Sequence, residues 1–388
     1  MAVDFNNTEL GFKHKSNGEL KFTKLILQML GNSSLTNVMT GLTGIALNLK
    51  LPIAWAVKPT IFKQFCGGTS IQDSEKTFKM LASHGIEAIL DYSVEGKENE
   101  KSFDDTQAEL LKLIENAKQF SKVPTTCLKV TGLGRFGVFQ KVSENAKLNQ
   151  AEKLEYNKII QRLDSICKKA NNLGVKIYID AEESWIQIAI DRLAEVMMRK
   201  YNKEKAIVYT TLQLYRHDKV AYLNDLIGMA RGEKFILGVK LVRGAYMEKE
   251  NERADKLGYP TPIQPDKTSC DNDYNKALSI VVDNIDVVEV CAGSHNENSA
   301  YHLISIMKEK DLDNNHPNIF FSQLYGMSDN ISYNLAHAGY NVSKYLPYGP
   351  VIDTVPYLIR RAEENTSVAG QMGKELKLVV QELTRRKS

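Results

Sequence analysis

The chain has 388 residues, of which 43% are hydrophobic and 25% are charged. These proportions are typical of a folded globular protein and exclude a disordered or collagen-like chain. The length predicts either two to three domains or one large α/β barrel with a substantial core. A balance of 50 Lys and Arg against 47 Asp and Glu gives a net charge of +3. We therefore expect no nucleic acid as the main partner, because proteins that bind the phosphate backbone carry a basic excess.

The N-terminal part of the chain carries neither a targeting signal nor a membrane-spanning pattern. It lacks the charged-then-apolar order of a signal peptide, and no Arg precedes Arg135, so a mitochondrial presequence is not expected. Although Leu25–Leu49 has no charged residue, its amide and hydroxyl side chains would be unfavourable in a bilayer. We predict packed helices there, with a turn at Gly31–Ser34, and no transmembrane segment.

Cysteine and histidine spacings indicate neither a disulfide framework nor a metal site. The five cysteines are an odd number without a CxxC pair, which predicts buried, reduced thiols. His295 and His302 are seven residues apart without an HExxH motif, and no GxSxG nucleophile motif occurs. Four further histidines are expected in loops or on helix surfaces: His14, His84, His316 and His337.

Eight short apolar runs recur along the chain, separated by amphipathic stretches. Each run is nearly continuously apolar, as expected for parallel strands that are covered on both faces. The runs are 85–91, 125–131, 175–180, 206–211, 235–242, 287–292, 318–324 and 341–346. The clearest helical stretches are 107–120, 151–173, 185–201, 219–232 and 274–284. This alternation predicts a (β/α)8 TIM-type barrel.

The alternation also predicts how the chain is organised. Residues 1–84 fall outside it and are expected to form a helical N-terminal segment packed on the barrel, while residues 85–388 form the barrel and its C-terminal helices. Gly174 is expected to cap the helix before the third strand. Met247–Tyr274 is charged and contains three prolines, so we predict a long loop after the fifth strand.

Polar residues gather at the carboxyl ends of the predicted strands, where barrel enzymes place their active sites. Any one of them could be a surface charge or a loop cap. Their recurrence at the same end of most strands favours a binding site. The residues are Lys129, Asp180, Glu182, Glu183, Gln213, Lys240, Arg243, Ser294, His295, Gln323 and Tyr345.

The helix after the last strand carries a second polar group. Tyr357, Arg360, Arg361 and Glu364 follow an i, i+3, i+4, i+7 spacing and so share one face. Two guanidinium groups beside a tyrosine suit a carboxylate or a phosphate, and a solvated basic patch is the alternative. Arg385–Arg386 repeat the dipeptide without the tyrosine, and we interpret them as a solvated tail.

The segment Gly132–Gly137 matches the GxGxxG pattern of dinucleotide-binding folds. That fingerprint opens a helix within a βαβ unit and is followed by an acidic residue ~20 positions later. The following VFQKVSENAKLNQ has no clear helical period. We therefore favour a flexible loop after the second strand over a Rossmann fold.

Several segments together resemble the proline dehydrogenase family. The two most specific are KLVRGAYMEKE at Lys240–Glu250 and YLPYGPVIDTVPYLIRRAEEN at Tyr345–Asn365. Three others occur in family order: CLKVTGLG at Cys127–Gly134, VKIYIDAEES at Val175–Ser184 and FSQLYGM at Phe321–Met327. The resemblance implies a distorted (β/α)8 barrel that uses FAD to oxidise L-proline to 1-pyrroline-5-carboxylate and passes the electrons to a membrane quinone.

The resemblance also implies roles for individual residues. Arg360 and Arg361 would bind the proline carboxylate and, with Asp180 and Lys240, form the catalytic set. Substrate contacts would come from Lys129, Tyr246, Leu324, Tyr345, Tyr357, Arg360 and Arg361. Flavin contacts would come from Asp180, Ala181, Gln213, Lys240, Val242, Arg243, Gly244, Ala245, Ser294, His295, Asn296 and Glu364. Glu95 resembles the family's gate carboxylate, and Met247 stands where many bacterial members have Trp.

Further expectations follow from the same resemblance. The chain is expected to be monofunctional and cytoplasmic, with a separate 1-pyrroline-5-carboxylate dehydrogenase as a partner. Contact with the inner face of the cytoplasmic membrane would be peripheral at most, through the helix around Lys374–Arg386, which could instead be an intramolecular packing element. The alternatives are a hydroxyproline dehydrogenase, which the bulk of Tyr345 argues against, and a non-catalytic barrel that has lost its flavin.

Overall fold

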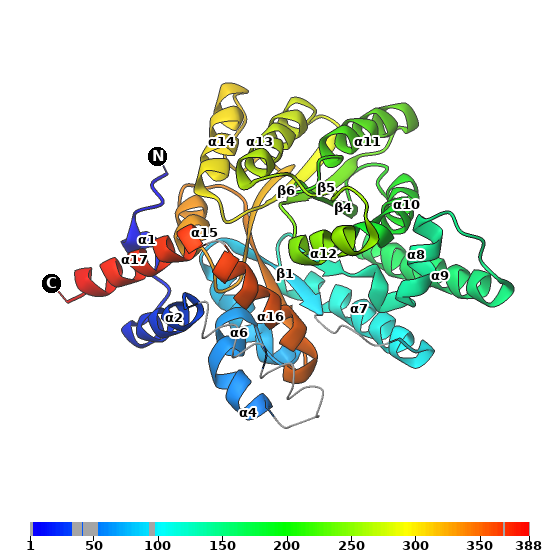
Figure 1. The fold of residues 1–388 in the computed structure, drawn as a ribbon. Helices are drawn as coiled ribbons and strands as arrows, with labels where there is room; N and C mark the ends of the chain where they lie inside the picture. Colours follow the sequence, from blue (N-terminus) through cyan, green and yellow to red (C-terminus); the bar gives the residue numbers. More distant parts are fainter. Residues whose placement is uncertain (1–2, 33–40, 42–52, 93–97, 368, 388) are drawn as a thin grey trace. The chain divides into compact units, whose positions relative to one another are not determined.

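Eight parallel strands form a closed barrel in chain order (Figure 1), which confirms the predicted (β/α)8 class. The computed structural model describes residues 3–32, 41, 53–92, 98–367 and 369–387, without the side chains of residues 120 and 362–372. The strands are β1 (Ile86–Tyr92), β2 (Thr125–Leu128), β3 (Lys176–Ile179), β4 (Val208–Gln213), β5 (Leu237–Val242), β6 (Val288–Gly293), β7 (Ile319–Leu324) and β8 (Val342–Tyr348).

Helices connect the strands and extend from both ends of the barrel sequence. Before β1 the structure describes α1 (Thr8–Gly11), α2 (Asn17–Leu30), α4 (Ala54–Val57), η1 (Lys58–Phe62), α5 (Lys63–Phe65) and α6 (Ile71–Ser83). From β1 to β5 it describes α7 (Glu100–Phe120), η2 (Val130–Leu133), α8 (Phe136–Ser143), α9 (Gln150–Leu173), α10 (Ser184–Tyr201) and α11 (Lys219–Glu233). The remainder are α12 (Met247–Leu257), α13 (Lys267–Asp283), α14 (Glu297–Glu309), α15 (Asp329–His337), α16 (Val351–Ser367) and α17 (Ala369–Arg385).

Two local interpretations of the sequence are wrong. The segment Met247–Tyr274 is not a loop but contains α12 and the start of α13. Gly258 ends α12 at φ +70°, and the Asp266 side chain caps α13 by accepting from the N–H of Ser269. The glycines of Gly132–Gly137 lead through η2 into α8 rather than a flexible loop. The high charge of Met247–Tyr274 and the glycines of Gly132–Gly137 gave no helical signal in the sequence, because tertiary packing stabilises these helices.

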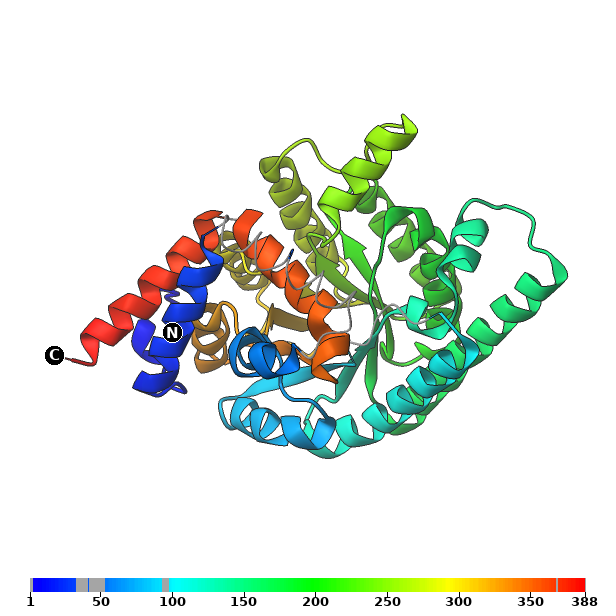
Figure 2. The ribbon, with the colours of Figure 1, turned by 60° about the horizontal axis from the view of Figure 1, so that its bottom comes forward.

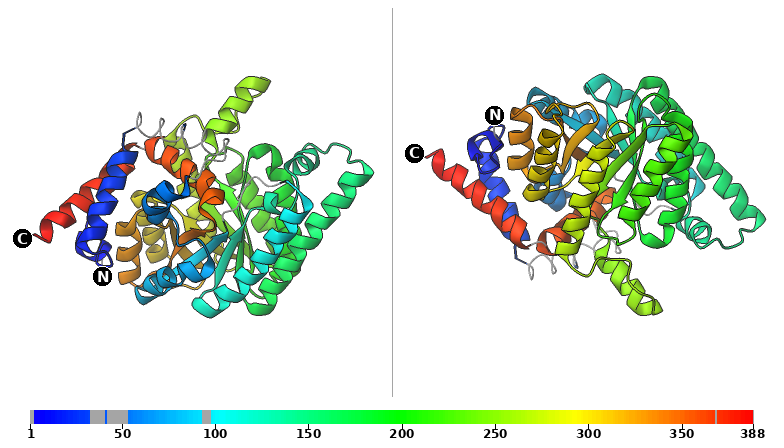
Figure 3. Two further views of the ribbon diagram at one scale, coloured as in Figure 1. Left: turned by 90° about the horizontal axis from the view of Figure 1, so that it is seen from below. Right: turned by 90° about the horizontal axis from the view of Figure 1, so that it is seen from above.

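By compactness the chain divides into two units, which we describe separately. Unit 1 comprises residues 1–95, 295–297 and 322–388, and unit 2 comprises 96–294 and 298–321. In unit 2, α7 packs along α9 (Figure 3). A capping box at Asn149 begins α9. Gly174 ends this helix at φ +67°, which confirms the predicted cap.

In unit 1 the C-terminal helix α17 packs against α2 and α1, as the adjacent red and blue helices of Figure 2 show. Leu378 and Val379 of α17 are buried in this contact. The carboxylate of Glu382, also fully buried, accepts from the guanidinium groups of Arg385 and Arg386. The apolar face of α17 is therefore used inside the protein.

The strand register of unit 2 shows which residues of neighbouring strands have their side chains on the same face of the barrel wall. Cys127, Tyr178, Tyr209 and Gly238 stand opposite one another on β2–β5. Tyr209 donates to the Glu289 carboxylate at 2.6 Å, and Lys176 pairs with the same carboxylate at 2.7 Å. Because side chains alternate along a strand, residues two positions further on have the same phase and lie towards the carboxyl ends. This next layer contains the predicted site residues Lys129, Asp180 and Lys240. Two residues further along the strands, the following layer contains Gln213 and Val242.

Three other predictions concern burial and the membrane. All five cysteines are free and buried, as expected. His14 lies in the turn between α1 and α2, as expected of a loop histidine, although its side chain is only 5% exposed. Part of the predicted turn Gly31–Ser34 and most of Leu25–Leu49 beyond Leu30 lie outside the described residues. Among the residues that are described, no helix has the length and apolar character needed to cross a membrane.

Candidate active site

A buried ion pair lies at the carboxyl end of β3 and β5 in unit 2. Asp180 follows β3 directly, and its carboxylate bonds to the ammonium group of Lys240 on β5. Both side chains are almost fully buried. Burial alone would lower the pKa of Lys240, but the adjacent Asp180 carboxylate outweighs it and raises that pKa. Lys240 therefore remains a cation inside the barrel.

A second buried carboxylate, Glu182, organises the loops around this pair. It accepts from the hydroxyl of Thr131 at 2.5 Å and from the N–H of the same residue at 3.2 Å. The Gln213 amide donates to the Glu182 carbonyl at 2.8 Å, and the Glu182 N–H donates to Gln187 at 2.7 Å. Burial raises the pKa of Glu182 to about 7. The loop after β2, which begins with Lys129, is thus tied to the ends of β3 and β4.

The Arg243 guanidinium is fixed at the ends of β5 and β6. Its Nε donates to Asp271 at 2.7 Å, and its two terminal nitrogens donate to Ser294 at 2.7 Å and Ser299 at 2.9 Å. Its guanidinium carbon lies 4.4 Å from the ring centroid of Tyr274. The side chain is 23% exposed, so a positively charged group is oriented in advance and still accessible.

The segment after Arg243 turns sharply into α12. Gly244 has φ +142°, and a Cβ there would lie 2.5 Å from the Tyr215 ring, so only glycine fits. Ala245 is exposed, whereas Tyr246 is buried at the start of α12. Glu250, fully buried, holds the helix by accepting from the N–H and the hydroxyl of Ser184 at 2.6 and 2.5 Å. Met247 is 42% exposed.

In unit 1, α16 presents the predicted tyrosine–arginine pair. The Arg361 guanidinium carbon lies 5.3 Å from the Tyr357 ring centroid, as an i, i+4 spacing predicts. Both side chains are buried, while Arg360 is half-buried. The side chain of Glu364 and the whole of Glu95 lie outside the described part of the chain.

The remaining predicted residues of unit 1 lie at the ends of β6, β7 and β8. Tyr345 is buried on β8, and its carbonyl accepts from the N–H of Tyr325, the residue after Leu324, at 2.9 Å. His295 Nδ1 lies 3.0 Å from the hydroxyl of Ser328, and its Nε2 lies 3.5 Å from the N–H of Leu324. Ser294 and Asn296, its neighbours in the chain, are half-buried, as is Ala181 after Asp180.

Within each unit the structure joins some predicted residues and adds others. It joins Asp180 to Lys240, Arg243 to Ser294, Tyr357 to Arg361 and His295 to Leu324. It adds Thr131, Gln187, Glu250 and Ser328, which bond to residues around these pairs. A single polar residue of this kind carries no local signal, although Thr131 and Glu250 lie inside recognised segments and Ser328 directly follows one. No cluster of metal-ligating side chains occurs within the described residues.

These features define a protein of the parallel (β/α)8-barrel class, with charged groups at the carboxyl ends of its strands. The sequence model of the family described as proline dehydrogenase matches residues 74–374. The chain therefore belongs to the proline dehydrogenase family of oxidoreductases.

Two individual relatives match most of this chain. The carbapenem antibiotics biosynthesis protein CarD of Pectobacterium carotovorum is 35% identical, covering 83% of each chain. The mitochondrial proline dehydrogenase 1 of Dictyostelium discoideum is 32% identical, covering 99% of this chain and 75% of its own. Among solved structures, proline utilization A of Bdellovibrio bacteriovorus has a TM-score of 0.76 at 19% identity, covering 94% of this chain and 42% of that one. This last similarity supports the fold.

Proposed function

We propose that the protein oxidises L-proline to 1-pyrroline-5-carboxylate with FAD and passes the electrons to a quinone. The observation that carries the proposal is the buried Tyr357–Arg361 pair on α16 in a chain that belongs to the proline dehydrogenase family. A guanidinium group on a rigid helix binds a carboxylate with fixed geometry. Arg360 and Arg361 would neutralise the proline carboxylate and orient the ring, with Tyr357 against Arg361.

The other proposed substrate residues shape the site around the ring. They are Lys129, Tyr246, Leu324 and Tyr345, in addition to the α16 residues. Positioning matters more than acid–base catalysis for a hydride transfer, so rigid side chains at strand ends suit the reaction. A cation beside the substrate would favour a neutral ring nitrogen, because a positive charge lowers the pKa of a neighbouring amine, and Lys240 and Arg243 are the residues proposed for this role. Glu95 remains the proposed gate carboxylate.

The residues of unit 2 fit a flavin dinucleotide. Arg243 offers a pre-oriented cation for an anionic pyrophosphate, and Gly244 leaves the following backbone open to close approach. Thr211, which stands opposite Lys240, has a buried hydroxyl without a hydrogen-bond partner in the described residues, as expected beside a polar cofactor. The full proposed set is Asp180, Ala181, Gln213, Lys240, Val242, Arg243, Gly244, Ala245, Ser294, His295, Asn296 and Glu364. When bound, FAD supplies the two-electron acceptor for the hydride from C5 of proline.

A hydroxyproline dehydrogenase is the second candidate. The hydroxyproline dehydrogenase of Xenopus laevis is 29% identical to this chain, covering 97% of it and 88% of the relative. We favour proline because the bulk of Tyr345 on β8 would exclude a hydroxyl at C4 of the ring. Equal kcat/KM values for hydroxyproline and proline would favour the second candidate instead.

The test of the proposal is a visible spectrum of the purified protein, with FAD added, before and after L-proline is supplied without oxygen. We expect absorbance near 450 nm that bleaches with proline and returns with a soluble quinone. A colourless protein that takes up no FAD would contradict the proposal and favour a non-catalytic barrel. A separate 1-pyrroline-5-carboxylate dehydrogenase is the proposed partner, and any membrane contact is proposed to be peripheral, with the protein in the cytoplasm.

A further inference from the structure

The turn between β7 and α15 is clamped at four consecutive residues by side chains from distant parts of unit 1. The Gly326 carbonyl accepts from Gln64 at 2.7 Å, and the Met327 carbonyl accepts from Lys344 at 2.5 Å. The Ser328 N–H donates to Glu375 of α17 at 3.0 Å. An irregular surface turn needs no such set of buried partners.

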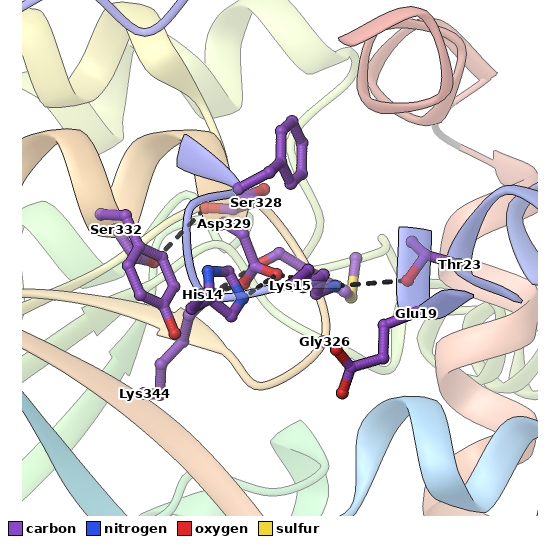
Figure 4. Close-up of polar contacts among 12 residues, drawn as sticks. His14, Lys15, Glu19, Thr23, Gly326, Ser328, Asp329, Ser332 and Lys344 are labelled. Carbon is purple, nitrogen blue, oxygen red and sulfur yellow. Dashed lines mark hydrogen bonds and ion pairs between the residues drawn. The ribbon is translucent and has the colours of Figure 1, made fainter. Parts of the chain in front are cut away.

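The fourth residue, Asp329, is the centre of a buried charge cluster (Figure 4). Its carboxylate lies 2.9 Å from both Lys15 and Lys344 and 3.4 Å from His14. Burial alone would raise the pKa of Asp329, but the two lysines hold it well below its ordinary value. The His14 ring stacks on Tyr333 with centroids 3.8 Å apart. Asp329 is therefore fixed by β8 and by the segment between α1 and α2.

The clamp holds backbone conformations that would not persist by themselves. Gly326 has φ +78°, and a Cβ there would lie 2.0 Å from the Gln64 carbonyl oxygen. Ser328 has φ +51°, a left-handed value that non-glycine residues adopt only where their surroundings enforce it. The Lys344 and Glu375 bonds hold both polar groups of the Met327–Ser328 peptide, which precedes the Ser328 Cα, and so support this conformation.

Ser328 connects the clamped turn to His295. The His295 Nε2 faces the N–H of Leu324, a donor, so Nε2 acts as the acceptor and the proton lies on Nδ1. The Nδ1–H then donates to the Ser328 hydroxyl at 3.0 Å. A hydroxyl can donate or accept, so the Leu324 N–H sets the tautomer, while the Ser328 hydroxyl holds the ring in the orientation that meets this N–H at the end of β7.

We infer that Ser328 and Glu375 are positioning residues for the reaction: through the clamped turn they fix His295 and, with it, Leu324. The inference rests on the proposed function, because His295 and Leu324 are the proposed flavin and substrate residues. It gives α17 a role in the active site, since Glu375 reaches Ser328 from that helix.

The direct test is Ser328→Gly, which deletes the hydroxyl and tolerates the left-handed backbone. In protein labelled with ¹⁵N in the histidine rings, we expect the His295 signals to shift and broaden, because the ring loses the hydroxyl that fixes its orientation, with His295→Asn identifying the signals. KM for proline is expected to rise ~5- to 10-fold, the effect of losing one hydrogen bond, while kcat changes less than ~3-fold. Unchanged His295 signals and an unchanged KM would overturn the inference.

A matched pair on α17 separates positioning from stability. Glu375→Leu and Glu382→Leu each remove a buried acceptor from the same helix, whereas glutamine would keep an oxygen that can accept from the Ser328 N–H. Glu382 bonds to Arg385 and Arg386 instead. We expect only Glu375→Leu to change the His295 signals and the KM. If both variants changed the His295 signals and the KM equally, α17 would only stabilise the fold, and the inference would be contradicted.

The spectra also keep the two proposals distinguishable. If L-proline fails to reduce the flavin of the wild-type protein, the proposed function fails. The ring-nitrogen signals of His295 still report whether Ser328 and Glu375 fix the orientation of its ring.

Discussion

At the scale of single residues, the buried charges of the barrel carry both the proposed chemistry and much of its sensitivity to substitution. Lys240 is held as a cation by Asp180, and Arg361 is held against Tyr357. A buried charge that loses its partner is far more costly than an exposed one. These positions therefore give the sharpest tests.

Arg361→Met removes the proposed carboxylate clamp. We expect KM for proline to rise ~10²-fold, as for the loss of a charge-assisted pair, with the FAD content unchanged because Arg361 is not among the proposed flavin residues. Arg385→Met is the control, since its side chain is 45% exposed and pairs with Glu9 and Glu382. Unchanged steady-state kinetics in Arg361→Met would refute the carboxylate assignment.

Asp180→Asn leaves the Lys240 ammonium group buried without its carboxylate. We expect a loss of ~3–5 kcal/mol in the free energy of unfolding, measured with urea. The control is Asp286→Asn, which breaks an ion pair on the surface: the side chain of Asp286 is 61% exposed and that of Arg231 is 47% exposed. This variant is expected to lower the free energy of unfolding by less than ~1 kcal/mol. Similar losses in both variants would show that burial of the Lys240 pair does not matter.

At the scale of elements, two glycines of similar appearance in the sequence play opposite roles. A Cβ on Gly238 of β5 would lie 2.5 Å from the Val208 carbonyl oxygen and 2.8 Å from the Tyr209 ring. Gly228, in the middle of α11, has open space around its Cα. Strand pairing fixes the first, whereas the second only weakens its helix.

We therefore expect Gly238→Ala to lower the free energy of unfolding by ~1–3 kcal/mol through overpacking. Gly228→Ala is expected to raise it by ~0.5–1 kcal/mol through helix propensity. Urea titrations of both variants check the pair. A stabilising Gly238→Ala would show that the interior between β4 and β5 has room for a methyl group.

The element scale also shows how far the sequence predicts the fold. All eight strands were predictable because runs such as those of β5 and β7 are mostly apolar, as is typical of strands that are buried on both faces. The helix α12 was not, since its residues are charged and Glu250 holds it through Ser184 of α10, a partner 66 residues away. Its stability comes from a contact that no local pattern contains.

At the scale of the whole molecule, buried carboxyls make stability depend on pH. Burial raises the pKa of Glu182 and of Glu375 from 4.5 to about 7, with Asp329 adding repulsion at Glu375. The folded protein thus keeps protons that the unfolded chain releases above pH 4.5. The free energy of unfolding is expected to fall as pH rises from about 4.5 to 7, and then to level off.

Glu182→Gln tests this dependence. The variant is expected to flatten the decline between pH 4.5 and 7 by on the order of 1–3 kcal/mol, because the amide does not titrate. Urea titrations at a series of pH values measure it, with Glu152→Gln as the control because Glu152 caps α9 at the surface. A slope identical to that of the wild type would show that Glu182 ionises at its ordinary pKa.

The candidate site divides in the same way between local and long-range information. The spacing of Tyr357 and Arg361 predicts their contact, because residues four apart share a helix face. Which residues of β3 and β5 share a face came from the strand register, because their runs are apolar nearly throughout and show no alternation. The sequence by itself therefore determined the strand count, the polar face of α16 and the family.

Only the tertiary structure decided which buried groups support those residues. Gln64 is 262 residues from Gly326, and Glu375 is 47 residues from Ser328, yet both hold the same turn. Patterns in a sequence report the neighbours of a residue within one helix or strand. The partners of His14, Asp329 and Glu375 are chosen when separate elements pack, because an isolated buried charge or N–H is stable only once its counterpart arrives.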